Sequence, residues 1–312
     1  LPIKSICQIS QNELCLGTDG KGTKIFNIPK QLITDYPFDN NYLDSGTSKV
    51  HSVLKDNAGN LWIAIYQKGV MMIPAQPNSF KYIGYKSINK NIIGSNCITS
   101  LCRDHKGILW IGTDNDGIYG ITTELKQKVH YAPHDSPSSV PSTVFGLYED
   151  SEHNLWFGSY TNGLGRLDKK TGQCSYLQNL TDKNGNRIQR VYDLVEDQDK
   201  RLWIATMGAG LFYYDLKTGQ SVYDPKFNAA TKKYKWISCL LYAGDNHLYV
   251  GTYDGIRCID LSTDDFKTEE ILSRHIIHSL YEDPQGNIWI GNSEGLAEWN
   301  PQTQQLKTYT TA

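Results

Sequence analysis

The sequence predicts an all-β fold, a seven-bladed β-propeller of four-stranded antiparallel blades. A short segment of the form apolar–aromatic–apolar–small, such as Leu109-Trp110-Ile111-Gly112, recurs six times, and a seventh copy, Leu14-Cys15-Leu16-Gly17, has cysteine in place of the aromatic residue. The central residues, here called the anchors, follow one another at spacings of 47, 48, 46, 47, 46 and 40 residues: Cys15, Trp62, Trp110, Trp156, Trp203, Tyr249 and Trp289. Repeats of this period are typical of propeller blades, and seven copies fall within the range that closes a ring.

The first two strands of each repeat are predicted from the residues before the anchor. Apolar residues stand nine and twelve positions before every anchor, as Leu194 and Val191 do before Trp203. Five repeats carry an aspartate six positions before the anchor, and a polar turn such as Asn57-Ala58-Gly59-Asn60 usually follows it. This pattern indicates a strand, a tight turn and a second strand that contains the anchor.

The remaining two strands follow a glycine that stands six or seven positions after each anchor and supplies the positive φ of a chain reversal. A third strand such as Leu211-Phe212-Tyr213-Tyr214 comes next. A weaker fourth strand ends the repeat, as at Phe80–Tyr82, Val129–Tyr131 and Leu306–Tyr309. We therefore expect one domain over 1–312 with blades at approximately 1–38, 39–85, 86–132, 133–179, 180–225, 226–272 and 273–312.

The repeated tryptophans, aspartates and glycines are interpreted as structural. The first two strands are nearly continuous apolar runs, as expected of sheets that are covered on both faces by neighbouring blades. The tryptophans would then form the core between blades, and the aspartates would cap turns.

Composition and charge exclude several classes of protein. The formal net charge is −2, and lysine and arginine are scattered along the chain, which argues against a nucleic-acid partner. No apolar run is long enough to cross a bilayer, and the first residues lack the pattern of a signal peptide. The seven cysteines form no CxxC pair and no zinc-binding spacing, so we expect buried free thiols, no metal and no cofactor. Free thiols alone lean toward a reducing compartment.

Repeats such as Leu147-Tyr148-Glu149-Asp150, followed by Asn154-Leu155-Trp156-Phe157-Gly158 and Gly163-Leu164, resemble the two-component regulator propeller repeat. The resemblance covers the whole chain. Repeats one and six depart from it, because Cys15 and Tyr249 replace the tryptophan and Ile9 and Ala243 replace the aspartate.

The resemblance implies a role in signalling. Such propellers belong to the extracytoplasmic sensor region of hybrid two-component histidine kinases of gut Bacteroidetes, which senses oligosaccharides. It implies a periplasmic ectodomain of an inner-membrane protein, with neighbouring propeller and β-sandwich domains in the same chain and a homodimer as the full-length sensor. Thiols buried between blades are poorly accessible to oxidants in any compartment. We therefore prefer the periplasmic location implied by the resemblance to the reducing compartment suggested by the free thiols.

A ligand site is expected on the face where first strands begin and second strands end. Long connections between repeats, such as Pro133–Thr143 and Asn179–Arg190, lie there and exceed what a turn needs. Aromatic rings suit the apolar faces of sugars, and amide or guanidinium groups suit hydroxyl and acidic groups. The candidate ligand-binding residues are His51, Tyr66, Asn115, Phe145, Tyr160, Arg190, Tyr192, Trp236, Tyr253 and His278.

Two alternatives remain open. The chain could be a pure protein-interaction scaffold. It could also be a propeller enzyme acting on glycans or cyclic substrates, with carboxylates on the same face: Asp114, Asp116, Asp254 and Glu294. No catalytic residue is assigned, because Asp and Asn are also favoured in turns. Asp114-Asn115-Asp116-Gly117 begins like a calcium loop, but Leu125 stands at its twelfth position, so a β-turn is expected.

Overall fold

The computed structural model describes residues 2–36, 47–75, 93–95, 97–122, 128–182, 184–223, 235–263 and 266–309. The chain divides into two compact units, Leu1–Gly94 and Ser95–Ala312. The expectation of one domain over 1–312 stays a prediction.

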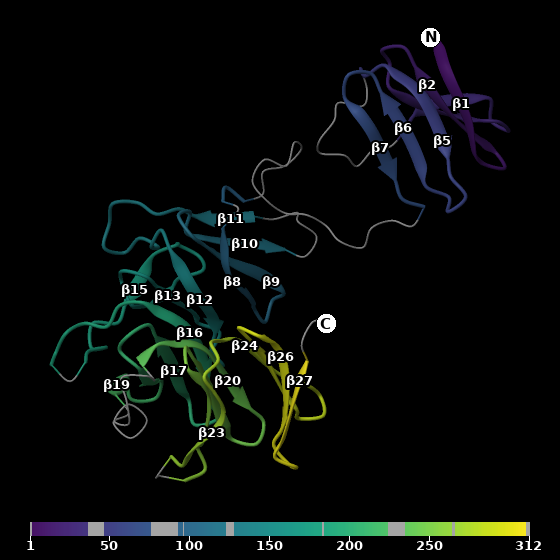
Figure 1. The fold of residues 1–312 in the computed structure, drawn as a ribbon. Coiled ribbons are helices and arrows are strands. Elements are labelled where there is room, and N and C mark those ends of the chain that lie inside the picture. The colour runs from purple at the N-terminus through teal and green to yellow at the C-terminus, as the bar shows by residue number, and fades with distance from the viewer. Residues whose placement is uncertain are drawn as a thin grey trace. The chain divides into compact units, whose positions relative to one another are not determined.

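The first unit contains two antiparallel sheets, called blades 1 and 2 (Figure 1). Blade 1 consists of β1 (Ile3–Ser10), β2 (Glu13–Thr18), β3 (Thr23–Asn27) and β4 (Leu32–Asp35). Blade 2 consists of β5 (Val50–Lys55), β6 (Leu61–Ile65) and β7 (Gly69–Ile73). Its expected fourth strand at Phe80–Tyr82 lies outside the described residues.

The second unit contains five four-stranded antiparallel sheets, blades 3 to 7, each with its strands in chain order. Blade 3 has β8 (Ile98–Arg103), β9 (Ile108–Thr113), β10 (Ile118–Thr122) and β11 (Lys128–Tyr131). Blade 4 has β12 (Val144–Glu149), β13 (Leu155–Ser159), β14 (Leu164–Leu167) and β15 (Cys174–Tyr176). Blade 5 has β16 (Val191–Glu196), β17 (Arg201–Thr206), β18 (Leu211–Asp215) and β19 (Gln220–Tyr223). Blade 6 has β20 (Ile237–Ala243), β21 (His247–Thr252), β22 (Gly255–Asp260) and β23 (Thr268–Ser273). Blade 7 has β24 (Ile277–Glu282), β25 (Ile288–Asn292), β26 (Gly295–Asn300) and β27 (Gln305–Tyr309).

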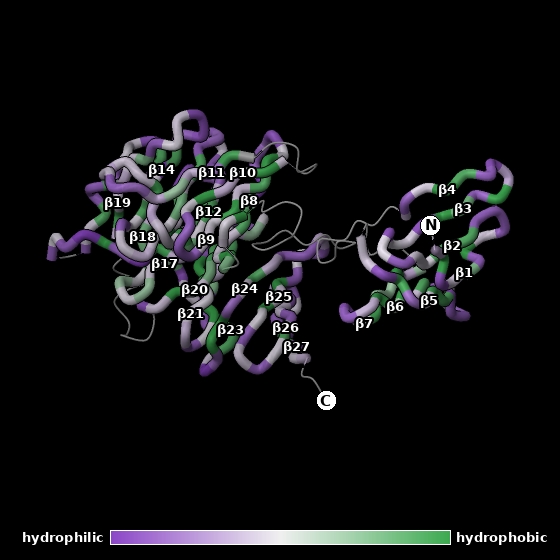
Figure 2. Tube along the Cα trace, turned by 90° about the horizontal axis from the view of Figure 1, so that it is seen from above, coloured by the Kyte–Doolittle hydropathy of each residue, from purple (hydrophilic) through white to green (hydrophobic). Residues whose placement is uncertain are grey.

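Seven consecutive antiparallel sheets confirm the predicted fold class, a seven-bladed β-propeller. The predicted fourth strands at Val129–Tyr131 and Leu306–Tyr309 correspond to β11 and β27. Hydrophobic residues, green in Figure 2, gather in the strands, and hydrophilic residues, purple, gather in the turns. The described residues include no helix that is long and apolar enough to cross a membrane.

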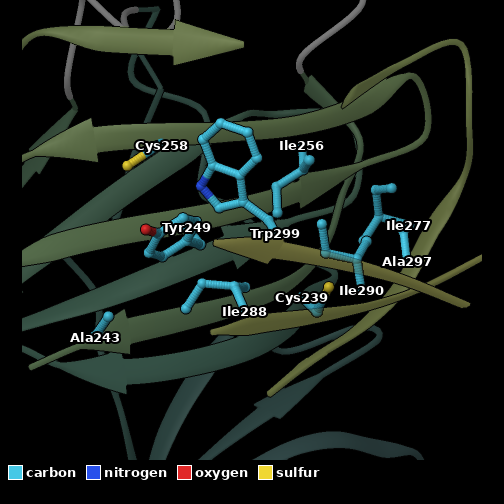
Figure 3. Close-up of a cluster of buried hydrophobic side chains, with 10 residues drawn as sticks. All are labelled: Cys239, Ala243, Tyr249, Ile256, Cys258, Ile277, Ile288, Ile290, Ala297 and Trp299. Atoms are coloured by element: carbon cyan, nitrogen blue, oxygen red, sulfur yellow. The ribbon is translucent and has the colours of Figure 1, made fainter. Parts of the chain in front are cut away.

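The hydrophobic core lies between successive blades, as the continuous apolar strands predicted. Trp110 of blade 3 packs with Val144 and Leu155 of blade 4. Between blades 6 and 7, Tyr249 and Ile256 pack against Ile277, Ile288 and other residues shown in Figure 3. The anchors of blades 1 and 3 to 6 are all at most 4% exposed.

Candidate ligand-binding surface

The first strand of every blade carries a β-bulge at the same repeat position. In blade 5, Val191 pairs with Thr206 and Asp193 pairs with Ala205, so Tyr192 is left without a partner in the ladder. The residues at this position are Lys4, His51, Thr99, Phe145, Tyr192, Ser238 and His278, with Gly146 as a second unpaired residue in blade 4. A bulge redirects side chains out of the regular alternation. Four of the ten predicted ligand-binding residues stand at these bulges.

Backbone hydrogen bonds hold the loops beside the bulges. After the second strand of blade 6, Tyr253 N donates to Trp236 O at 3.1 Å, and after that of blade 5, Met207 N donates to Arg190 O at 3.0 Å. Arg190 N in turn donates to Tyr160 O of blade 4 at 3.2 Å. Each loop is therefore hydrogen-bonded to the residue before the first strand of its own blade or of the next blade. These bonds restrain the backbone that carries the side chains.

Six predicted residues from blades 4, 5 and 6 form what we call the aromatic surface: Phe145, Tyr160, Arg190, Tyr192, Trp236 and Tyr253. Phe145 stacks on Tyr192 with ring centroids 4.3 Å apart and meets Tyr160 edge-on at 6.0 Å. The Arg190 guanidinium carbon lies 5.1 Å from the centre of the Tyr160 ring. Trp236 and Tyr253 meet edge-on at 5.7 Å.

The aromatic surface is accessible although its rings contact one another. Tyr160, Trp236 and Tyr253 are 42–43% exposed, while Phe145 and Tyr192 are half-buried. Burial raises the pKa of Tyr192, and nearby Tyr253 and Tyr160 raise it further, so this phenol is neutral at physiological pH. No carboxylate among the described residues forms an ion pair with Arg190. The surface thus offers aromatic faces, phenolic hydroxyls and one guanidinium group.

The other four predicted residues are not part of the aromatic surface. His51 and Tyr66 lie in the first unit and stack on each other with ring centroids 5.0 Å apart. Asn115 lies in the turn after β9 with a φ of 88°, and its backbone N donates to Ser142 O. His278 is exposed at the bulge of β24.

Comparison with known proteins agrees with the repeat. Four segments of the chain match the family described as two component regulator propeller: residues 92–115, 138–161, 182–208 and 271–294. The chain carries two-component regulator propeller repeats. No curated protein matches it.

Solved structures with the same fold include two extracellular domains from B. thetaiotaomicron. That of the hybrid two component system BT4673 superposes with a TM-score of 0.65 at 21% identity, over 99% of this chain and 43% of that one. That of the hybrid two component system BT3049 gives a TM-score of 0.56 at 21% identity, over 99% of this chain and 46% of that one. PorZ, a surface component of the type-IX secretion system of Porphyromonas gingivalis, gives 0.54 at 10% identity, over 99% and 57%. This propeller therefore spans less than half the length of the two B. thetaiotaomicron domains.

The carboxylates considered for catalysis make local contacts. Thr143 Oγ1 donates to Asp114 Oδ1 at 2.7 Å, and the Tyr119 hydroxyl bonds to Asp116. His275 Nε2 lies 3.2 Å from Glu294 Oε2. Residues 114–117 form a turn, as expected, rather than a calcium loop with an entering helix.

Sequence reasoning missed one group of potential metal ligands in the second unit, formed by His105, Glu149 and His153. Neither histidine belongs to a spacing motif, since they stand in turns of successive repeats. The signal that was available is their place within the repeat: they occupy the turn between first and second strands in repeats three and four.

Proposed function

We propose that this chain is an extracytoplasmic, non-enzymatic ligand-binding propeller of a two-component sensor, and that the aromatic surface binds an oligosaccharide. The sensor role is supported by the family repeats and by the likeness to extracellular domains of hybrid two component systems. On this proposal the chain is one part of a longer periplasmic ectodomain attached to the inner membrane.

The observation that carries the ligand proposal is the aromatic surface itself. Exposed aromatic rings give flat apolar faces for the C–H side of sugar rings, and the tyrosine hydroxyls and the indole N–H can answer sugar hydroxyls. A set of half-exposed rings from three blades, held on a bonded backbone, is suited to a ligand several sugar rings long.

Calorimetry of the isolated chain against neutral and uronic-acid-containing oligosaccharides tests the proposal. Trp236→Ala and Tyr192→Ala should each weaken binding by about 1–3 kcal/mol, as loss of an aromatic anchor does. Tyr281→Ala, which removes an exposed ring of β24 outside the surface, is the matched control and should leave affinity unchanged. Equal affinity of all three variants would show that the ligand binds outside the aromatic surface. If the chain bound neither class of glycan, the scaffold alternative would be favoured.

A substitution of Arg190 tests whether the surface prefers acidic or neutral oligosaccharides. Its guanidinium can bind a carboxylate in a bidentate geometry that lysine does not match. Arg190→Lys should therefore weaken binding of the acidic oligosaccharides more than that of the neutral ones. An equal effect on both classes would show that Arg190 acts only by supporting the Tyr160 ring.

Two further outcomes concern the alternatives. A scaffold would bind no glycan but would associate with another domain of the same sensor. An enzyme would release a cleavage product during long incubation, and Glu294→Gln would abolish it. Such a product would overturn the non-enzymatic part of the proposal.

A further inference from the structure

Three potential metal ligands from blades 3 and 4 meet beside the turns that join first to second strands. His105 lies in the turn between β8 and β9, Glu149 ends β12, and His153 lies in the turn between β12 and β13. His105 Nδ1 lies 2.8 Å from Glu149 Oε1, and the two imidazole rings stack with centroids 3.7 Å apart. One ligand atom from each residue falls within 4.8 Å of the others.

The Glu149 carboxylate is held in place and kept ionised. Its side chain is only 9% exposed. Its oxygens accept hydrogen bonds from His105 N at 2.6 Å and from Lys169 Nζ at 2.6 Å. Burial alone would raise the pKa of Glu149, but the bonds from Lys169 and His105 outweigh burial and hold it below its usual value. A carboxylate held close to two imidazoles combines the oxygen and nitrogen ligands that bind transition metal ions.

His153 stands at a repeat position that favours glycine. The residue three positions before the anchor has a positive φ in blades 2 to 7, and it is Gly59, Gly107 and Gly286 in blades 2, 3 and 7. His153 adopts a φ of 68° there, a conformation that costs an L-residue energy that glycine does not pay. Its ring has no hydrogen-bond partner among the described residues and lies over the ring of His105. Local backbone geometry therefore does not account for a histidine at this position.

We propose that His105, Glu149 and His153 bind a divalent transition metal ion, with Zn²⁺ the best match. Two imidazole nitrogens and one carboxylate oxygen form a known zinc donor set, and water would complete a tetrahedral site. Each histidine binds as a neutral imidazole through one ring nitrogen, so a histidine that carries an extra proton releases it on binding. The Lys169 ammonium gives up its bond to Glu149 Oε1 and stays beside Asp104 Oδ2, from which it lies 3.6 Å.

The metal would join two blades. His105 comes from blade 3, while Glu149 and His153 come from blade 4. Because the ligands converge only in the folded protein, bound metal stabilises the folded state and should raise the thermal unfolding midpoint.

The repeat provides substitutions that remove each histidine with little harm to the fold. His153→Gly introduces the residue that three other blades carry at this position. His105→Ser introduces the residue of blade 4, where Ser151 N donates to Glu196 Oε2 at 2.6 Å, just as His105 N donates to Glu149. Urea unfolding without metal checks that both variants stay folded.

Zinc titration of untagged protein by calorimetry at pH 7.5 is the test. Wild type should bind one Zn²⁺, and each histidine variant should bind at least about tenfold more weakly, since even supporting residues of metal sites have effects of this size. His247→Gln, which removes a histidine paired with Asp245 in blade 6, is the control and should bind as wild type does. Lys169→Met removes the competing cation and should tighten binding.

Further measurements distinguish zinc binding at this site from zinc binding elsewhere on the protein. The thermal midpoint should rise with Zn²⁺ in wild type but not in the double variant H105S/H153G. Affinity should fall between pH 7.5 and pH 5.5, because protons compete for the imidazoles. Equal binding by the double variant and wild type would overturn the proposal. Loss of binding in Cys97→Ser, which removes an exposed thiol, would also overturn it by placing the ion elsewhere.

Discussion

The indole Nε1 of Trp203 donates a hydrogen bond to Oδ2 of Asp197, six residues earlier, at 2.8 Å. Four other repeats contain the same bond at 2.7–2.9 Å: Trp62 to Asp56, Trp110 to Asp104, Trp156 to Asp150 and Trp289 to Asp283. Repeats one and six lack both partners. The aspartate and the tryptophan are replaced together because they are partners in one hydrogen bond. Without the indole N–H, the carboxylate oxygen of the aspartate loses a donor.

This relationship predicts graded losses of stability. Trp203→Phe keeps most of the packing but removes the bond to a charged acceptor, and should cost about 1–3 kcal/mol of unfolding free energy. Trp203→Ala also opens a cavity and should cost about 3–5 kcal/mol. Urea unfolding measures both. If Trp203→Phe proved neutral, the bond would contribute nothing beyond packing.

Gly158 shows why a small residue follows each anchor at the second position. A Cβ atom there would lie 2.4 Å from Val191 O and 2.7 Å from Val191 Cγ1 of the next blade. Gly158→Ala should therefore destabilise the chain by about 1–3 kcal/mol, as overpacking does. Ala205 occupies the same place in blade 5, so Ala205→Gly is the reciprocal variant, expected to lose about 1 kcal/mol for one buried methyl group. A neutral Gly158→Ala would mean that blades 4 and 5 can move apart.

Asp193 makes stability depend on pH in the opposite sense to most carboxylates. Desolvation in β16 raises the pKa of Asp193 to about 6, despite the hydrogen bonds that its carboxylate accepts from Leu240 N and Leu194 N. The folded chain therefore holds this proton more tightly than the unfolded chain. The unfolding free energy should fall as pH rises from about 4 to about 6, by up to about 3 kcal/mol for this group, and then level off.

The measurement is the difference between wild type and Asp193→Asn in urea unfolding at pH 4, 5, 6 and 7.5. Taking the difference removes the contributions of Asp104 and Glu149, whose lowered pKa values act in the reverse direction. The variant should gain stability relative to wild type as pH rises. A difference that does not change with pH would show that the Asp193 carboxylate is hydrated.

The cysteines should differ sharply in reactivity. Burial raises the pKa of the thiols of Cys15, Cys174, Cys239 and Cys258 to about 12, whereas Cys97 is exposed. Since the thiolate is the reactive form, a thiol reagent at pH 8 should modify Cys97 rapidly and leave these four intact until the chain unfolds. Mass spectrometry of peptides locates the modified positions. Rapid labelling of Cys239 in the native protein would contradict the packing between blades 6 and 7.

Much of the fold was predictable because each blade repeats one local pattern. Anchors, turn aspartates and glycines mark the strands, and β11 and β27 appear where weak fourth strands were expected. For the candidate site, the repeat predicted which residues stand at the bulges, but it did not show that Phe145 stacks on Tyr192 while His51 stacks on Tyr66.

The sequence by itself determined the number of blades, their strands and the residues at each turn and bulge, because these depend on local propensities that recur with a fixed period. Only the tertiary structure decided which side chains meet across successive blades. Tyr160 and Arg190, or His105 and His153, are dozens of residues apart and share no motif. They come together because neighbouring blades bring their loops side by side. The identity of each side chain in those loops, and not the repeat, sets the chemistry.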